Sequence, residues 1–308
     1  MKVYNCIKDF KPTANTIVTI GTFDGVHLGH QAIFNRMKEE AAKRKGTTVL
    51  ITFSPHPRMV LQKDSQNLKF INTYQKKLER IEKAGIDHLV VIEFTKEFAN
   101  NSSEDFISNY VVQYIQPQLI VIGYDHHFGK NREGNIELLE KVKSNFGFEV
   151  IQVSPYYVDG QPVSSTRVRK LLQEGNVREA NQMLGYEYAL TGKVVRGNAI
   201  GRTIGFPTAN IETPKEFKLI AANGVYACRT LIKGKLYKGM GNIGVRPTID
   251  HGELTIEINI FDFDEEIYDE TITIMFVDRL RDEKKFESLD ALKEQLEKDR
   301  EQSIQLLK

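Results

Sequence analysis

The pattern of apolar and polar positions divides the chain near Gly185. In the first part, short β-branched apolar runs alternate with amphipathic stretches that have helical spacing. The strand-like runs are 16–20, 47–53, 88–92, 119–122 and 149–153, and the helix-like stretches are 31–43, 104–114 and 133–145. This alternation predicts a parallel sheet that is covered by helices on both faces and binds ligands beyond the carboxyl ends of its strands.

After Gly185 the strand-like segments are shorter, and glycine, proline and asparagine interrupt them. They are 190–195, 224–232, 237–243, 254–261 and 270–277. Residues 253–263 alternate apolar and polar side chains, as a strand with one buried face does. This part therefore predicts a small barrel or sandwich. A last helix is expected after Ser288, which can cap it. We expect two domains, residues 1–185 and 186–308.

Composition narrows the class of protein. The chain has 308 residues, 41% apolar and 27% charged, with a formal net charge of +1. These values are typical of a globular protein and give no bulk attraction for nucleic acid or an anionic membrane. Cys6 and Cys228 form no CxxC pattern, which favours two reduced thiols. No apolar segment resembles a secretion signal or a membrane span, so we expect a cytoplasmic protein with small-molecule partners, while weak self-association stays open.

A glycine-rich motif, GTFDGVHLGH, covers residues 21–30 between a predicted strand and a predicted helix. Gly25 and Gly29 let the backbone approach a ligand, and the start of a helix presents N–H groups to an anion. His27 and His30 are three residues apart, so they share a face of the first helical turn. There they can stabilise the charge that develops on a phosphate under attack.

Two other interpretations of this histidine pair stay open from the residues alone. The pair can be two surface side chains in a turn. It can also be half of a zinc site that His126 and His127 complete, although the chain offers no clear Cys or His cluster for it.

Three further segments follow in the first part: TFSPHP at 52–57, GYDHHFG at 123–129 and VSSTRVR at 163–169. Asp125 follows a predicted buried strand, where a carboxylate can accept from ligand hydroxyl or amide groups. The hydroxyls of Ser165 and Thr166, with the guanidinium of Arg169 one turn later, suit a second phosphate clamp.

With GTFDGVHLGH, these segments resemble the adenylyltransferase module of prokaryotic FAD synthetases, a Rossmann-like α/β nucleotidylyltransferase. The family usually has an aromatic residue where this chain has His126. The resemblance implies that His27 and His30 are catalytic. It implies nucleotide contacts at Gly21, Phe23, Asp24, Gly25, His27, Gly29, His30, Asp125, Ser165, Thr166 and Arg169.

The second part contains the sharpest motif, GRTIGFPTAN at 201–210. Gly201 and Gly205 permit a tight loop around phosphates. Thr208 and Asn210 offer hard oxygen ligands that suit Mg²⁺, although such a segment can also be only a turn. Further along, Glu257 lies on a predicted strand opposite Ile256 and Ile258, which fits both an outward-facing surface residue and a carboxylate that accepts a proton from a ligand hydroxyl.

Four segments of the second part resemble the riboflavin kinases. They are GRTIGFPTAN at 201–210, NGVY at 223–226, GMGNIGVRPT at 239–248 and residues 276–281. The resemblance implies an antiparallel barrel with a C-terminal helix, Glu257 as catalytic base, and Thr208 and Asn210 as Mg²⁺ ligands. It implies nucleotide or flavin contacts at Gly201, Arg202, Gly205, Pro207, Thr208, Asn210, Asn242 and Arg279.

In order, the two parts resemble the bifunctional riboflavin kinase/FMN adenylyltransferases. This implies that riboflavin is phosphorylated to FMN and that FMN is adenylylated to FAD, with ATP, riboflavin and FMN as substrates and Mg²⁺ as cofactor. Three alternatives stay open: a riboflavin kinase with a degenerate first domain, a flavin-binding regulatory protein, and a cytidylyltransferase, because HxGH alone does not choose the base.

Overall fold

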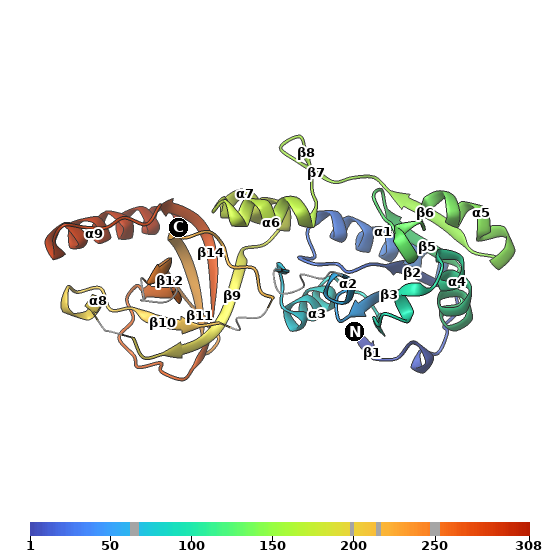
Figure 1. Ribbon diagram of the computed structural model, residues 1–308, viewed down its shortest axis with the longest axis horizontal. Coiled ribbons are helices and arrows are strands. Elements are labelled where there is room, and N and C mark those ends of the chain that lie inside the picture. Colours follow the sequence, from blue (N-terminus) through green and yellow to red (C-terminus); the bar gives the residue numbers. More distant parts are fainter. Residues whose placement is uncertain (62–67, 198–199, 214–216, 247–252) are drawn as a thin grey trace. The chain divides into compact units, whose positions relative to one another are not determined.

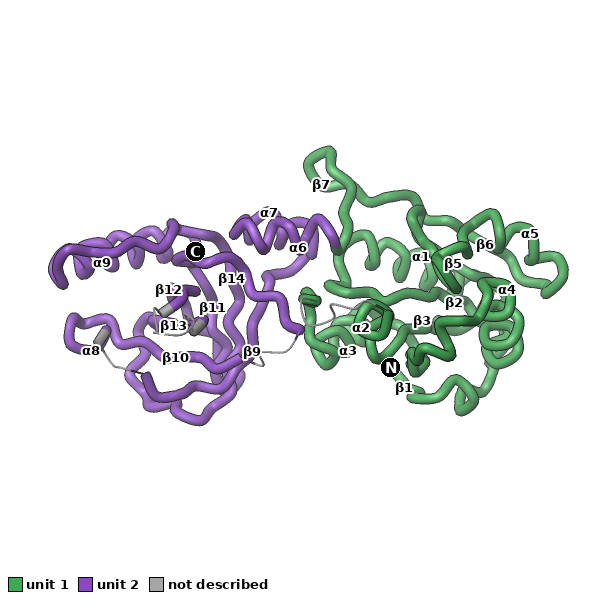
Figure 2. The backbone as a smooth tube through the Cα atoms, in the orientation of Figure 1, with its two compact units in different colours: residues 1–165 green, residues 166–308 purple. Residues whose placement is uncertain are grey.

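The computed structural model describes residues 1–61, 68–197, 200–213, 217–246 and 253–308. It contains two compact units, Met1–Ser165 and Thr166–Lys308, which are coloured separately in Figure 2. Pro247 and Thr248, which the sequence places in a kinase motif, lie outside the described residues.

The first unit is built on a six-stranded parallel sheet of order β1-β4-β3-β2-β5-β6 (Figure 1). Its strands are β1 (Lys2–Tyr4), β2 (Thr16–Ile20), β3 (Thr47–Ser54), β4 (His88–Glu93), β5 (Leu119–Gly123) and β6 (Glu149–Val153). Its helices are α1 (Leu28–Arg44), α2 (Pro57–Leu61), α3 (Tyr74–Lys83), α4 (Ser103–Phe106), the π-helix η4 (Ile107–Ile115) and α5 (Ile136–Phe146). Short 3₁₀ turns are η1 (Ile7–Asp9), η3 (Phe98–Asn100) and η5 (Lys130–Arg132), and a hairpin joins β7 (Tyr157–Val158) to β8 (Gln161–Pro162).

Both faces of this sheet are buried, as the apolar runs predict. Along β2, Ile17 belongs to the core beneath α1 and α3, whereas Val18 belongs to the core beneath α4, η4 and α5. Along β3, Leu50 belongs to the core beneath α1 and α3, and Val49 belongs to the core beneath α4, η4 and α5. The side-chain alternation of each strand therefore supplies two separate apolar layers.

The predicted α/β unit is confirmed, with two local differences. The edge strand β1 has three residues, too few to show a period, and was not expected. The helix expected over 104–114 is observed as α4 continuing into the π-helix η4. Apolar spacing predicts a helix, but it does not separate i→i+4 from i→i+5 bonding.

The second unit contains a closed antiparallel barrel of order β10-β13-β12-β11-β14-β9. Its strands are β9 (Tyr188–Val195), β10 (Ala209–Glu212), β11 (Gly224–Ile232), β12 (Lys235–Arg246), β13 (Glu253–Ile260) and β14 (Thr271–Arg281). Its helices are α6 (Ser165–Gln173), which begins at the last residue of the first unit, α7 (Val177–Leu184), α8 (Ile200–Thr203) and α9 (Leu289–Leu306). The strand pattern alone fits a barrel or a sandwich, and the barrel that the resemblance implies is confirmed. The short β10 closes it between β9 and β13.

The last helix begins where the sequence predicts. The side-chain oxygen of Ser288 accepts from the backbone N–H of Ala291 at 3.1 Å, so Ser288 is the N-cap of α9. The helix packs against β11, β12 and β14. Among the residues that the structure describes, no helix has the length and apolar content needed to cross a membrane.

Candidate active sites

The order of the parallel strands brings three sequence motifs to one edge of the first sheet. β2 pairs with β3 on one side and with β5 on the other, so the direction of strand order reverses at β2. Ligands of such sheets bind beyond the carboxyl ends of the strands at this point. The histidine motif follows β2, residues 55–57 follow β3, and Asp125 follows β5.

The segment 21–27, here called the histidine loop, has an unusual backbone. Phe23, Gly25 and Val26 adopt φ values of 50°, 85° and 40°. A left-handed conformation costs a residue with a side chain on the order of 1–3 kcal/mol. At Gly25 a Cβ would also lie 2.9 Å from Cδ1 of Ile71, so both the φ value and the available space require glycine.

Contacts from other segments hold the histidine loop in this conformation. The buried carboxylate of Asp24 accepts from the backbone N–H groups of Ile71 and Asn72 at 3.1 and 3.2 Å. The hydroxyl of Ser165 donates to the carbonyl of Asp24 at 2.8 Å. The amide of Gln31 donates to the carbonyl of Val26 at 3.0 Å. Asp24 and Ser165, predicted as nucleotide contacts, therefore also fix the loop.

The histidine pair lies at the N-terminus of α1. His27 is the N-cap, and its Nδ1 accepts from the backbone N–H of His30 at 3.3 Å. Because Nδ1 accepts, the proton of the neutral ring lies on Nε2. The two rings stack with centroids 3.6 Å apart and 17° between their planes, and the edge of Phe23 packs against His30. Imidazole donors, helix N–H groups and the helix dipole together suit a phosphate.

His126 takes the place of the family's usual aromatic residue. Its ring is partly buried and stacks on Phe128, with centroids 5.6 Å apart. Burial, with smaller contributions from the nearby His127 and Arg132, lowers the pKa of His126 to about 4. The side chain is therefore neutral at physiological pH and packs as an aromatic ring does.

Two residues predicted for the same phosphate site belong to the second compact unit. Thr166 and Arg169 lie in the first turns of α6, whose beginning the sequence predicts at this place. Their role beside the histidine pair stays a prediction.

In the second unit, strand pairing brings together three predicted site residues. Glu257 on β13 pairs with Asn210 on β10 and with Asn242 on β12. Residues directly opposite each other in antiparallel strands have side chains on the same face. Glu257 is partly exposed, on the face opposite the buried Ile256 and Ile258. A carboxylate and two amides from three adjacent strands thus share one surface of the barrel.

Glu257 and Asn242 of this surface line a cavity of about 380 Å³, here called the kinase cavity. The cavity combines a few polar side chains with apolar side chains from the motif loop and α9, the usual character of a site for a small organic ligand. It is lined by Gly201, Ile204, Phe206, Thr208, Val225, Met240, Gly241, Asn242, Glu257, Asn259, Arg281, Glu283, Lys284, Phe286, Leu292 and Leu296.

The GRTIGFPTAN segment reaches the kinase cavity through a fixed turn. The side-chain amide of Asn259 donates to the carbonyl of Pro207 at 2.7 Å, directly before Thr208. A Cβ at Gly201 would overlap the carbonyl of Phe206, so glycine is needed for the close approach. Asn259 was not expected as a site residue, because nothing in its strand marks a partner 52 residues away.

Of two arginines on β14, the structure places Arg281 rather than the predicted Arg279 at the kinase cavity. Arg281 lines the kinase cavity and forms an ion pair with the buried Asp299 of α9, with Nη2 and Oδ2 2.8 Å apart. Arg279, predicted as a ligand contact, lines a neighbouring depression instead, where it donates to the carbonyl of Asn223 and pairs with Asp282. Its ligand contact stays a prediction. Strand alternation alone would place Arg279 and Arg281 on the same face, and it does not reveal the register shift that separates them in the pairing of β14 with β11.

The possible metal ligands at the kinase cavity are few and neutral. Within the described residues, no group of three or more His, Cys, Asp or Glu side chains is placed to hold a metal ion. Thr208 at the kinase cavity and Asn210 opposite Glu257 provide neutral oxygen atoms. Such a site fits Mg²⁺, which takes few protein ligands and completes its shell with water and nucleotide phosphate.

A nucleotide site at the switch point of a parallel sheet, followed by a barrel with a carboxylate in its cavity, defines a two-unit phosphoryl- and nucleotidyl-transferring enzyme. A family model described as FAD synthetase matches residues 9–167, and one described as riboflavin kinase matches residues 184–307. The chain belongs to the family of bifunctional riboflavin kinase/FMN adenylyltransferases. The resemblance read from the motifs is thereby confirmed, together with the predicted fold class.

Relatives with this name span nearly the whole chain. The one from Listeria monocytogenes is 39% identical over 286 residues, 92% of this chain and 90% of its own. The one from Buchnera aphidicola is 37% identical over 303 residues, 97% of this chain and 96% of its own. A crystal structure described as a macrolide-efflux protein from Streptococcus pneumoniae is 34% identical, covers 97% of both chains and has a TM-score of 0.89.

Proposed function

We propose that this chain makes FAD from riboflavin in two ATP-dependent steps, with the residues described above carrying each step. The chain is a bifunctional transferase. Its second unit phosphorylates riboflavin to FMN, and its first unit adenylylates FMN to FAD with release of pyrophosphate. What supports the residue assignment most directly is that Glu257, which lines the kinase cavity, pairs with both Asn210 and Asn242 on the neighbouring strands.

In the kinase step, the terminal ribityl hydroxyl of riboflavin attacks the γ-phosphorus of ATP, and ADP leaves. Glu257 accepts the proton of that hydroxyl. Thr208 and Asn210 would hold Mg²⁺, which would supply neutralisation of charge on the nucleotide phosphates. Asn259 keeps Thr208 in place through the carbonyl of Pro207.

In the adenylylation step, a phosphate oxygen of FMN attacks the α-phosphorus of a second ATP. The nucleophile is already ionised, so little general-base catalysis is needed, and positioning with charge stabilisation dominates. His27 and His30 donate to the α-phosphate, and Thr166 and Arg169 extend this clamp. Asp24 and Ser165 fix the loop that carries the histidines.

The enzyme uses Mg²⁺, works in the cytoplasm, and has ATP, riboflavin and FMN as its partners rather than nucleic acid or membrane. The net charge of +1 gives no bulk attraction for nucleic acid or an anionic membrane, which supports small-molecule partners.

Incubation of the purified chain with riboflavin, ATP and Mg²⁺ tests this proposal, with FMN and FAD resolved over time. FMN should appear first and FAD after it, and FMN supplied directly should give FAD without a lag. FMN formation without FAD from either starting material would indicate a degenerate first unit. Flavin binding without ATP consumption would indicate a regulatory protein. FAD-like product with CTP but not ATP would indicate a cytidylyltransferase.

A further inference from the structure

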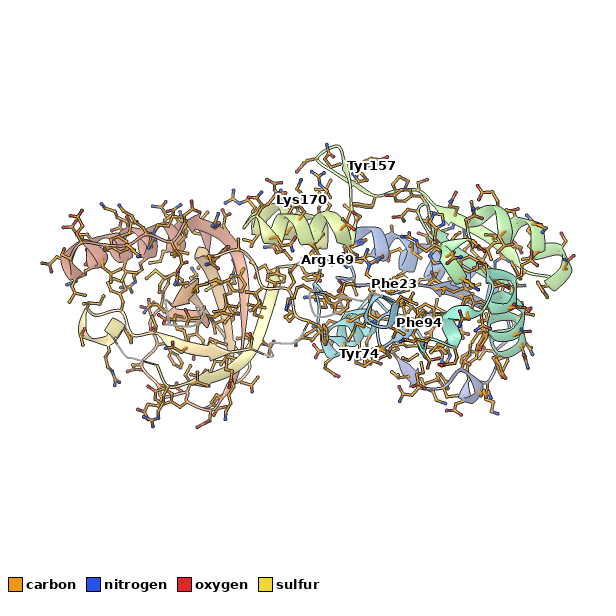
Figure 3. The ribbon with its side chains drawn as sticks, in the orientation of Figure 1. Phe23, Tyr74, Phe94, Tyr157, Arg169 and Lys170 are labelled. Atoms are coloured by element: carbon orange, nitrogen blue, oxygen red, sulfur yellow. The ribbon has the colours of Figure 1, made fainter. Side chains whose placement is uncertain are left out.

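A buried lysine lies behind the histidine loop and has no role in the mechanism above. Lys77, on α3, is 8% exposed. Its Nζ donates to the carbonyl of Thr22 and to the hydroxyl of Thr52, at 3.2 Å in each case. It lies 5.5 Å from the ring centroid of Tyr74, and Figure 3 shows Tyr74 on α3 and Phe23 in the loop after β2.

These contacts tie together the first part of the histidine loop and the end of β3. Thr22 precedes Phe23, which adopts the first left-handed conformation of the loop. Asp24 is bound to the backbone of Ile71 and Asn72, which directly precede α3. The loop is therefore attached to the α3 segment twice, once through Asp24 and once through Lys77.

An ammonium group in an apolar setting needs compensation, because burial disfavours its charged form. At Lys77 the compensation comes from two oxygen acceptors, the Tyr74 ring and the carboxylate of Asp24. Burial lowers the pKa of Lys77 to about 8, and Asp24 opposes this effect. An exposed lysine loses little hydration, whereas the buried ammonium of Lys77 is costly to dehydrate. Its presence here therefore points to a requirement for a donor that reaches the carbonyl of Thr22.

We infer that Lys77 is a positioning residue for adenylyl transfer: its ammonium fixes the carbonyl of Thr22 and thereby the conformation of the loop that presents His27 and His30. This inference rests on the proposed histidine site. A displacement of about 1 Å at reacting groups can cost about 10²-fold in rate. Lys77 acts through the loop and does not itself touch the reacting phosphates.

The first test compares Lys77→Met with Lys76→Met in the full-length chain, with FMN, ATP and Mg²⁺ supplied. Lys76 is the matched control, because its Nζ lies 2.9 Å from Oε2 of Glu79 on the surface of the same helix. Lys77→Met should lower kcat for FAD formation about 10–100-fold, with KM for FMN within about twofold. Lys76→Met should keep the wild-type rate, and both variants should keep the wild-type rate of FMN formation.

The pH profile separates positioning from a general loss of structure. Of the groups that face Lys77, Asp24 carries a charge, Tyr74 belongs to the same helix, and Thr22 and Thr52 are neutral. Since the charged ammonium is the required form, wild-type kcat for FAD formation should fall as pH rises through about 8. Arginine stays charged, so Lys77→Arg should lose this alkaline decline.

Each outcome has a defined meaning. A wild-type chain that makes no FAD from FMN sinks the proposed function itself. If the wild type is active, a Lys77→Met variant of unchanged kcat overturns the role of Lys77. If Lys77→Met does not fold, the wild-type profile still decides, because a kcat that is constant between pH 7 and 10 overturns the inference as well.

Discussion

At the scale of single residues, His30 is the side chain on which adenylylation depends most directly in the proposed mechanism. Replacing it with alanine removes one donor to the α-phosphate and the ring that stacks on His27. We expect FAD formation from FMN to fall about 10²–10³-fold, the usual loss for one transition-state donor. FMN formation by the same preparation should be unchanged. Equal loss of both activities in a folded variant would contradict the division between units.

Glu257 should show the reverse pattern. Glu257→Gln keeps the size of the side chain and its place opposite Asn210 and Asn242, but it removes the base. Riboflavin phosphorylation should fall about 10²–10⁴-fold, because this is the range that general-base catalysis contributes. FAD formation from added FMN serves as the control and should stay at the wild-type rate. A kinase of wild-type rate would remove the base assignment.

His126 offers a test of pH dependence. Its pKa in the folded protein, about 4, lies below the ordinary value of 6.5. Between these two values the unfolded chain binds more protons, so the free energy of unfolding decreases as pH falls from about 6.5 to about 4. In His126→Phe this part of the decrease should be absent, and FAD formation at neutral pH should stay within about twofold.

Urea unfolding at several pH values, followed by circular dichroism in wild type and variant, measures this difference. Equal acid sensitivity of the two proteins would show that His126 titrates normally in the folded state.

At the scale of elements, α9 and β14 shape the kinase cavity together. Asp299 is 2% exposed and accepts three hydrogen bonds from Arg281 and one from Gln295. Removal of one partner of a buried ion pair costs about 3–5 kcal/mol, because the other charge is left unpaired. We expect Asp299→Ala to destabilise the second unit by about this amount and to lower kinase activity.

The control for this prediction is Glu297→Ala, on the exposed face of the same helix. Thermal unfolding and the rate of FMN formation are the measurements. If both variants behave alike, the ion pair does not hold α9 in place.

At the scale of the whole molecule, the segment 166–185 decides where a functional fragment begins. The family matches end at 167 and begin at 184, whereas the compact second unit begins at Thr166. α7 buries Val177, Ala180 and Leu184, and it packs against β9 and β14. Its Asn181 donates to the carbonyl of Phe276 and accepts from the N–H of Tyr188.

We therefore expect a fragment of residues 166–308 to be more stable than one of residues 186–308, although the sequence predicted a boundary at 185/186. Both fragments can be compared by thermal unfolding and by riboflavin phosphorylation. Equal stability and activity would show that residues 166–185 contribute nothing to the barrel and would favour the boundary predicted from the sequence.

The sequence by itself determined the local features, because these depend on neighbours along the chain. The periods of apolar positions predicted the two kinds of unit, Ser288 marked the start of α9, and the glycine-rich motifs marked the two candidate sites. Even His27 and His30 could be placed on one helical turn, since three residues separate them.

Only the tertiary structure decided which distant segments meet. The pairing of Glu257 with Asn210 and Asn242 follows from the register of strands that no local pattern specifies. Closure of the barrel by β10, the choice of Arg281 over Arg279 at the cavity, and the reach of Lys77 to Thr22 have the same cause. Each depends on hydrogen bonds and burial between residues far apart in the chain, which become fixed only when the whole unit packs.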